Sequence, residues 1–284
     1  GKKRSSSSAP SATLGLPGKD PVVRGGVRFK KCKALTIQMG NLEADFDYNG
    51  GIVNISRFAF DAYDGKVTGM MTVYPQRPAR YTCSATVRGC RLGVFLTENK
   101  YLENVMTGSM AADVVFSGRG TSYEEVKASF GGKGSLELTG GRVAKLPLLE
   151  ELAKWSRIDY YDPLQVSKLW VMAEARDGRI RTTDLRIENG DMVISAAGEV
   201  GLDKTLNFTV ATTFDKKAAD RLAREAKALA LVRDADGRGH FNFVVTGEVS
   251  KPAFQLEAKS MLGTSVGGAP TGGQSPTGEI GDIF

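Results

Sequence analysis

The chain has 284 residues, of which 41% are hydrophobic and 25% are charged, and its formal net charge is +6. This composition is typical of a folded protein with a substantial core, and no run approaches the roughly 20 apolar residues that a membrane-spanning helix needs. The charge excess is small and the basic residues are mixed with acidic ones, so nucleic acid is not an expected partner. The same excess suits contact with an anionic membrane surface.

The two ends differ in composition from the middle of the chain. Residues 1–26 contain four consecutive serines with scattered Pro and Gly, and residues 259–284 are rich in Gly, Ser and Pro. Both compositions are typical of flexible segments. We therefore expect a linker over 1–26, a folded domain over 27–258 with a candidate sub-boundary near 90–105, and a disordered tail over 259–284. Because the first residue is Gly, we expect a processed or shortened chain whose N-terminal signal or anchor has been removed.

A pattern of strands separated by Asx-Gly pairs occurs twice, over 42–73 and over 169–202. The pairs are Asn49-Gly50, Asp64-Gly65, Asp177-Gly178 and Asn189-Gly190. Such pairs tolerate the positive φ of tight hairpin turns, and alternating apolar residues flank them here. The spacing differs slightly between the copies, so we interpret them as a diverged repeat of antiparallel strands, with each of the four glycines at positive φ.

Alternation of apolar and polar residues continues along the chain and predicts half-buried strands with one apolar face. The residues expected to line a groove on this face are Leu42, Phe46, Leu185, Ile187, Met192, Ile194, Leu206, Phe208, Phe241 and Phe243. A long apolar face must be covered by a helix, a partner or a ligand.

Three or four amphipathic helices are expected on this sheet. They comprise a short one near 92–98, one after the capping box of Ser122 and Glu125, one starting at Pro147, and one capped by Asp215 that runs to about Val232. In the helix that starts at Pro147, Glu150 and Lys154 are spaced as an i,i+4 ion pair. The aromatic residues 155, 160 and 161 follow, either as an interfacial patch or as a packed helix end. The predicted fold is α+β, predominantly antiparallel β, with a curved and twisted meander sheet.

Residues that carry catalysis or bind metals are sparse. His240 is the only histidine, and no G-x-S-x-G elbow, Walker loop or His-rich set is present. Cys32, Cys83 and Cys90 lack metal-ligand spacing. Cys83 and Cys90 either form a disulfide or are small buried side chains, and Cys32 is expected to be a free thiol. We therefore expect no catalytic residue, no metal and no cofactor.

Four stretches resemble, in the same order, the C-terminal region of AsmA-family proteins. They are Met106–Thr121, Ser122–Val143, Ala173–Ile187 and Phe243–Leu256. In that family a strand that ends in G-x-G leads to a short helix and then to a strand of the form G-x-G-x-L-x-L-x-x-G. Here the corresponding glycines are Gly118 and Gly120, and the second strand is Gly132–Gly141.

The resemblance implies a bacterial envelope protein that is anchored in the inner membrane by an N-terminal helix, which this chain lacks, and that projects into the periplasm. Its repeating β-groove would carry phospholipid toward the outer membrane and support outer-membrane biogenesis. The implied partners are phospholipid acyl chains and a membrane surface or envelope proteins, and no catalytic residues are implied. Acyl chains need a continuous apolar lining rather than precisely placed polar groups, which agrees with the predicted face.

Other functions and one other fold stay open at this point. The same face would also serve a non-transporting scaffold or assembly factor for outer-membrane proteins. An enzyme that modifies envelope glycans or lipids is the third candidate. For the fold, the alternative is an ordinary sandwich in which the helix after Asp215 and a second sheet fill the apolar face.

Overall fold

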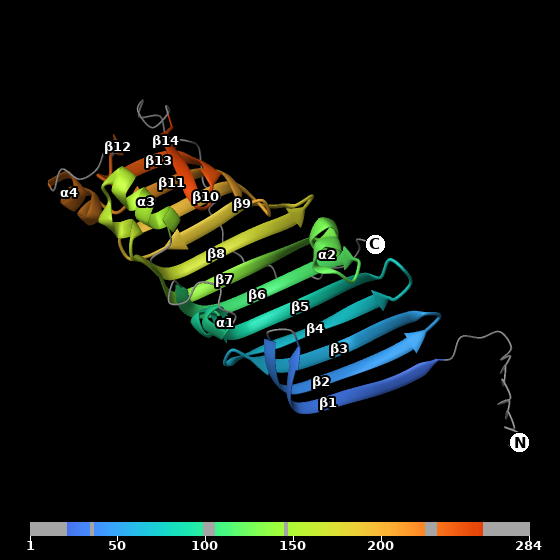
Figure 1. Ribbon diagram of the computed structural model, residues 1–284. Helices are drawn as coiled ribbons and strands as arrows, with labels where there is room; N and C mark the ends of the chain where they lie inside the picture. Colours follow the sequence, from blue (N-terminus) through green and yellow to red (C-terminus); the bar gives the residue numbers. More distant parts are fainter. Residues whose placement is uncertain (1–21, 35–36, 99–105, 145–146, 225–231, 258–284) are drawn as a thin grey trace, which may run out of the picture.

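In the computed structural model the described residues are 22–34, 37–98, 106–144, 147–224 and 232–257. They form one open, curved sheet of 14 antiparallel strands in the order β1 to β11, then β13 and β12, with β14 also beside β13 (Figure 1). The strands are β1 (Val23–Ala34), β2 (Ile37–Asn49), β3 (Ile52–Ala62), β4 (Gly65–Tyr74), β5 (Arg80–Arg91), β6 (Met106–Arg119), β7 (Gly131–Val143), β8 (Leu164–Arg176), β9 (Arg179–Glu188), β10 (Met192–Gly201), β11 (Thr205–Phe214), β12 (Val232–Arg233), β13 (Gly239–Glu248) and β14 (Lys251–Leu256). The predicted meander is confirmed.

Short helices lie at the ends of the strands. They are α1 (Leu92–Glu98), α2 (Tyr123–Ser129), α3 (Pro147–Ser156), the 3-10 helix η1 (Asp159–Tyr161) and α4 (Lys216–Arg224). The capping box of α2 is confirmed, because the Ser122 hydroxyl accepts from the Glu125 N–H and the Glu125 carboxylate accepts from the Ser122 N–H. The four predicted helix positions are therefore correct.

Two details of the helix predictions are wrong. Val232, the expected end of the last helix, instead pairs with His240 as part of β12, and residues 225–231 lie outside the described part of the chain. Lys154 pairs with Glu151 at 2.8 Å rather than with Glu150. Positions i+3 and i+4 are both neighbours on a helix surface, so spacing alone does not choose between them.

All four Asx-Gly pairs lie where two strands of a hairpin meet, but only two of the glycines have the predicted conformation. Gly50 has φ 57° and Gly178 has φ 72°. In the turn between β3 and β4 the positive φ falls on Tyr63 and Asp64 instead. Gly65 is required for another reason, since a Cβ at this position would lie 2.6 Å from the Arg88 carbonyl oxygen.

The turn between β9 and β10 is made by a side chain. The Asn189 Oδ1 accepts hydrogen bonds of 2.9 Å from the N–H groups of Asp191 and Met192. An Asx turn of this kind takes over the hydrogen bonds of a tight backbone turn. The prediction of positive φ at Gly190 is therefore wrong, although the hairpin itself is present.

The boundaries and the cysteines also need correction. β1 begins at Val23, inside the predicted linker, and β5 pairs with β6 along most of its length, so the sheet continues across the candidate sub-boundary near 90–105. Cys83 and Cys90 lie on the same extended strand and therefore do not approach each other, which rules out the disulfide. Together with Cys32, they are free thiols.

Candidate functional site: an apolar face that is open at one end

The strand register places apolar residues on the same face across nearly the whole sheet. Directly opposed residues of an antiparallel pair project to the same side, so a chain of register partners traces one line across the sheet. From β3 to β14 this line, which we name the central apolar row, consists of Phe60, Val67, Val87, Ala112, Leu136, Val171, Leu185, Ala196, Val210, Phe243 and Leu256. Next to it on the other face runs a polar line of Thr68, Thr86, Asp113 and Ser135. The sheet therefore has one continuous apolar face.

At the C-terminal end this face is closed by α3 (Figure 1). The Trp155 ring lies between 5.3 and 5.8 Å, centroid to centroid, from the rings of Phe241, Phe243 and Phe254. Leu152 of the same helix is buried in the same hydrophobic cluster. Of the two alternatives for the aromatic residues after Pro147, packing against the sheet is therefore correct.

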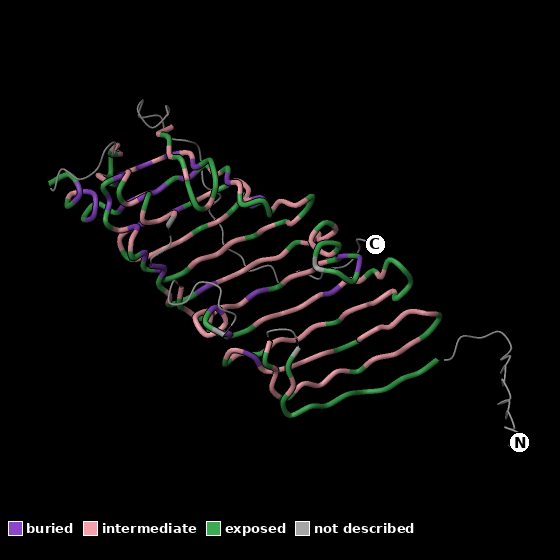
Figure 2. Tube along the Cα trace, in the orientation of Figure 1, coloured by how far each residue is buried: buried purple, intermediate pink, exposed green. Residues whose placement is uncertain are grey.

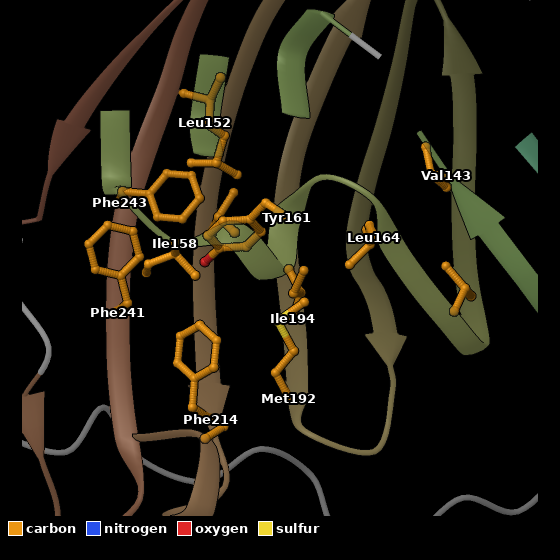
Figure 3. Packing of buried hydrophobic residues seen from close by; sticks show 14 of the residues in the cluster. Val143, Leu152, Ile158, Tyr161, Leu164, Met192, Ile194, Phe214, Phe241 and Phe243 are labelled. Atoms are coloured by element: carbon orange, nitrogen blue, oxygen red, sulfur yellow. The ribbon is translucent and has the colours of Figure 1, made fainter. Parts of the chain in front are cut away.

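A buried hydrogen bond fixes η1 to the sheet at the same end. The Tyr161 hydroxyl donates to the Thr212 Oγ1 at 2.8 Å, and both residues are fully buried. Burial raises the pKa of Tyr161 above its usual value, so this hydroxyl stays protonated and able to donate. Figure 3 shows Tyr161 and Ile158 lying against the buried side chains of the sheet.

The sandwich alternative is wrong for the described residues, because all of their strands belong to one sheet. α4 contributes Ala218, Ala219 and Leu222 to the closed core, but most of the cover comes from α3 and η1. The closed core therefore has one helical layer on one sheet.

The residues predicted to line a groove divide into two groups. Met192, Ile194, Leu206, Phe241 and Phe243 are at most 9% exposed and lie in the closed core. The prediction is corrected at these five positions, because α3 and η1 fold back over them. Leu42, Phe46, Leu185, Ile187 and Phe208 are half-buried, and Ile187 and Phe208 pack against the margin of the core. The strands far from α3 thus present more of their apolar residues at an open surface.

From β1 to β5 the apolar face is open, whereas Leu138 and Val143 of β7 already belong to the closed core. Val23, Val27 and Phe29 of β1, which are register partners of apolar residues in β2, are 49%, 36% and 51% exposed. In Figure 2 buried residues gather toward the C-terminal end, whereas β1 to β4 are mostly intermediate or exposed. The helices α1 and α2, which border this part of the sheet, lie at opposite ends of the strands and pack mainly on β6. They border the open face without covering it.

The single histidine lies on the polar face with partners that the sequence reasoning did not find. The His240 Nε2 is 2.9 Å from the Asp234 Oδ2, and its Nδ1 is 3.3 Å from the Thr213 Oγ1. Asp234 also accepts from the Arg238 side chain and from two backbone N–H groups of the turn before β13. The hydrogen bond with His240, followed by that with Arg238, holds the pKa of Asp234 well below its usual range. This cluster stabilises the β12–β13 turn, on the side opposite the apolar face.

Other candidate sites are shallow. Two hollows of about 600 and 750 Å³ lie at the strand ends near α1. The first is beside Lys66 and Arg88, and the second is beside Arg91 and Thr139. Among the described residues there is no group of three or more His, Cys, Asp or Glu side chains that is placed to hold a metal ion. The open apolar face is therefore the main candidate site.

No protein-family model matches this sequence, and comparisons with curated proteins and with solved structures found no significant match. None of the helices in the described ranges is long and apolar enough to cross a bilayer. What the chain does is therefore inferred from the geometry of the apolar face.

Proposed function

We propose that this chain binds phospholipid along its apolar face and conducts it between membranes, as the C-terminal periplasmic module of an AsmA-like envelope protein. The observation that carries the proposal is the central apolar row, which continues without a polar residue from the closed core onto the open strands. In this role the chain would support outer-membrane biogenesis while tethered to the inner membrane through the rest of the protein. The lipid would pass unchanged, so the role is not enzymatic.

The dimensions of the open face suit an acyl chain. From β1 to β5 there are four steps between strands of about 4.8 Å each, or about 19 Å in all. An acyl chain that fills one leaflet of a bilayer core about 30 Å thick is about 15 Å long. Each methylene that leaves water contributes about 0.8 kcal/mol when fully buried. A chain lying across the strands would therefore find apolar contacts along its whole length and still have room to move.

A second candidate is a non-transporting scaffold for outer-membrane proteins. In the described part of the chain no strand pairs with the outer edge of β1, and its apolar residues Val23 and Phe29 are exposed. A free edge of this kind can accept a strand from another protein. On this alternative the apolar face would bind a partner's side chains instead of lipid.

Two adjacent methionines give a matched test. Met71 is a register partner of Ile55 and Cys83 on the apolar face, whereas Met70 pairs with Ser84 on the polar face and is 58% exposed. We expect Met71→Asp to stay folded by circular dichroism and to lose most of the bound lipid, since a carboxylate beside an acyl chain must be desolvated. Met70→Asp should keep the bound lipid.

The measurement is mass spectrometry of lipid extracted from the purified chain, together with transfer of labelled phospholipid between vesicles. Phe46→Asp gives a second variant on the open face. If the wild type carries no lipid and transfers none, the conduit proposal is wrong and the scaffold remains. If Met70→Asp and Met71→Asp lose lipid equally, lipid binding does not depend on the apolar face.

A further inference from the structure

Glycines on the apolar face lie directly opposite aromatic residues of the neighbouring strand. The register pairs in which the aromatic ring itself reaches the glycine are Gly25 with Phe46, Gly69 with Phe58, Gly118 with Tyr81, and Gly198 with Phe208. They fall between β1 and β2, β3 and β4, β5 and β6, and β10 and β11, so three of the four lie on the open half. The pairing places an aromatic residue beside the one residue type without a side chain.

In each pair the aromatic ring occupies the space above the glycine. A Cβ built on Gly25 would lie 3.0 Å from the Phe46 Cζ, and one built on Gly118 would lie 2.7 Å from the Tyr81 Cζ. The corresponding distance from Gly69 to the Phe58 Cζ is 2.5 Å. The rings therefore lie across the neighbouring strand instead of standing up from the sheet, an arrangement that shields the glycine backbone from water.

Rings that lie flat have a consequence for the shape of the face. A ring that projects from the sheet would form a ridge across the path of a chain, whereas a flat ring adds apolar area with little height. The open face is therefore an even apolar floor and not a series of side-chain pockets.

We propose that the glycine–aromatic pairs set the clearance of this floor, so that the protein binds phospholipids by their thin, flexible acyl chains with little regard to chain length. This inference rests on the proposed lipid-binding function and adds which residues control it. Gly25, Gly69 and Gly118 are then positioning residues, because each allows the opposite ring to lie down. A pocket that selected one chain length would instead need residues that close its end.

Two of these glycines allow the ring to be moved without disturbing the backbone. The nearest atoms to a Cβ at Gly118 all belong to the Tyr81 ring and hydroxyl, and those at Gly25 all belong to the Phe46 ring. Neither glycine has positive φ, so alanine fits its conformation. At Gly69, by contrast, the added atom would also collide with the Ser84 carbonyl oxygen, so substitution there would strain the sheet itself.

The chain also offers a matched control and a rescue. Gly26 follows Gly25 on the opposite, polar face, where a Cβ would lie 3.0 Å from the Asp45 Oδ1. Gly26→Ala therefore adds the same methyl group to the same strand without moving a ring on the floor. The double variant with Gly118→Ala and Tyr81→Ala removes the displaced ring and should restore the clearance.

The experiment measures transfer of labelled phospholipids with short and long acyl chains between vesicles of phosphatidylethanolamine and phosphatidylglycerol, using the full 284-residue chain. We expect the wild type to transfer both chain lengths at rates within about threefold of each other, or about 0.6 kcal/mol in barrier. Gly118→Ala and Gly25→Ala should slow both transfers about tenfold, equivalent to about 1.4 kcal/mol in barrier height, while Gly26→Ala and the double variant should stay near the wild-type rate.

Three results would overturn the inference while the lipid-transfer function stands. They are a wild type that strongly prefers one chain length, a folded Gly118→Ala that transfers at the wild-type rate, and a double variant that stays as slow as the single one. Unfolding of both Gly118→Ala and Gly25→Ala, measured by circular dichroism, would also overturn it, because the glycines would then serve the fold alone. A wild type that transfers no lipid contradicts the proposed function itself and this inference with it.

Discussion

A charge placed in the closed core tests whether α3 and η1 seal the C-terminal end. Ile194 is 6% exposed and lies opposite Thr212 and Ile187. Replacing Ile194 with Asp removes a buried aliphatic side chain, which costs about 2–5 kcal/mol for comparable truncations. It also buries a carboxyl group without a partner, at a further cost of about 1–3 kcal/mol even when the group is neutral. The sum of roughly 3–8 kcal/mol is comparable with the 5–15 kcal/mol stability of a typical domain.

The assay is urea unfolding followed by circular dichroism, with Ser195→Asp as the matched control. Ser195 is the next residue along β10, is exposed, and lies opposite Arg186 on the polar face, so an added carboxylate there should change stability by less than about 1 kcal/mol. Burial raises the pKa of a carboxyl group, so Ile194→Asp should recover part of its stability as the pH falls and the group is protonated. If Ile194→Asp and Ser195→Asp unfold at the same urea concentration, the C-terminal end is not closed.

Two further predictions concern polar contacts. Tyr161→Phe leaves the buried Thr212 hydroxyl without its partner and should lower the free energy of unfolding by about 1–3 kcal/mol. Adding Thr212→Val removes the unpaired hydroxyl and should recover part of this loss. Equal stability of the single and double variants would contradict the prediction. Because the folded pKa of Asp234 is lowered, its stabilising effect is present above the unfolded value of about 3.9 and is lost as the pH falls below it. Asp234→Asn should therefore lower the melting temperature at pH 7 and weaken the loss of stability between about pH 4 and pH 2; an unchanged acid profile would contradict this.

The hairpins could be predicted from local sequence, whereas the details of their turns could not. Asx-Gly pairs mark the place where a strand must reverse, and all four reversals are present. Several turn types accept the same Asx-Gly pair, and the contacts of the turn with neighbouring residues determine which type forms. At Gly65 the choice depends on the close backbone of Arg88, which is distant in the sequence. In the turn between β9 and β10 the Asn189 side chain determines the turn type through a local hydrogen bond, so the presence of Asn at this position could have predicted it.

The division of the apolar face into open and closed parts could not be predicted from alternation. Leu42 and Ile194 both lie in strands that alternate in the same way, yet one is half-buried and the other is buried. The difference comes from α3, whose Trp155 folds back onto strands that follow it by many residues. The histidine cluster was more accessible to prediction, because Asp234 lies six residues before His240 in a turn-forming stretch.

The closed end constrains how a conduit built in this way can work. Because Trp155 and Tyr161 cover β11, β13 and β14, a lipid on the open strands would, on the proposed function, meet packed side chains before it reached the last strand. It would then leave past the ends of the strands or displace α3, and the second route would expose a buried aromatic cluster to water. The strand ends near β5 to β7 are bordered by α1 and α2, which are only seven residues long each, whereas α3 places Trp155 against three aromatic rings of the sheet. On the proposed function, exit past one of these strand ends would therefore be the less costly route, and lipid would be released between the open and closed halves of the sheet.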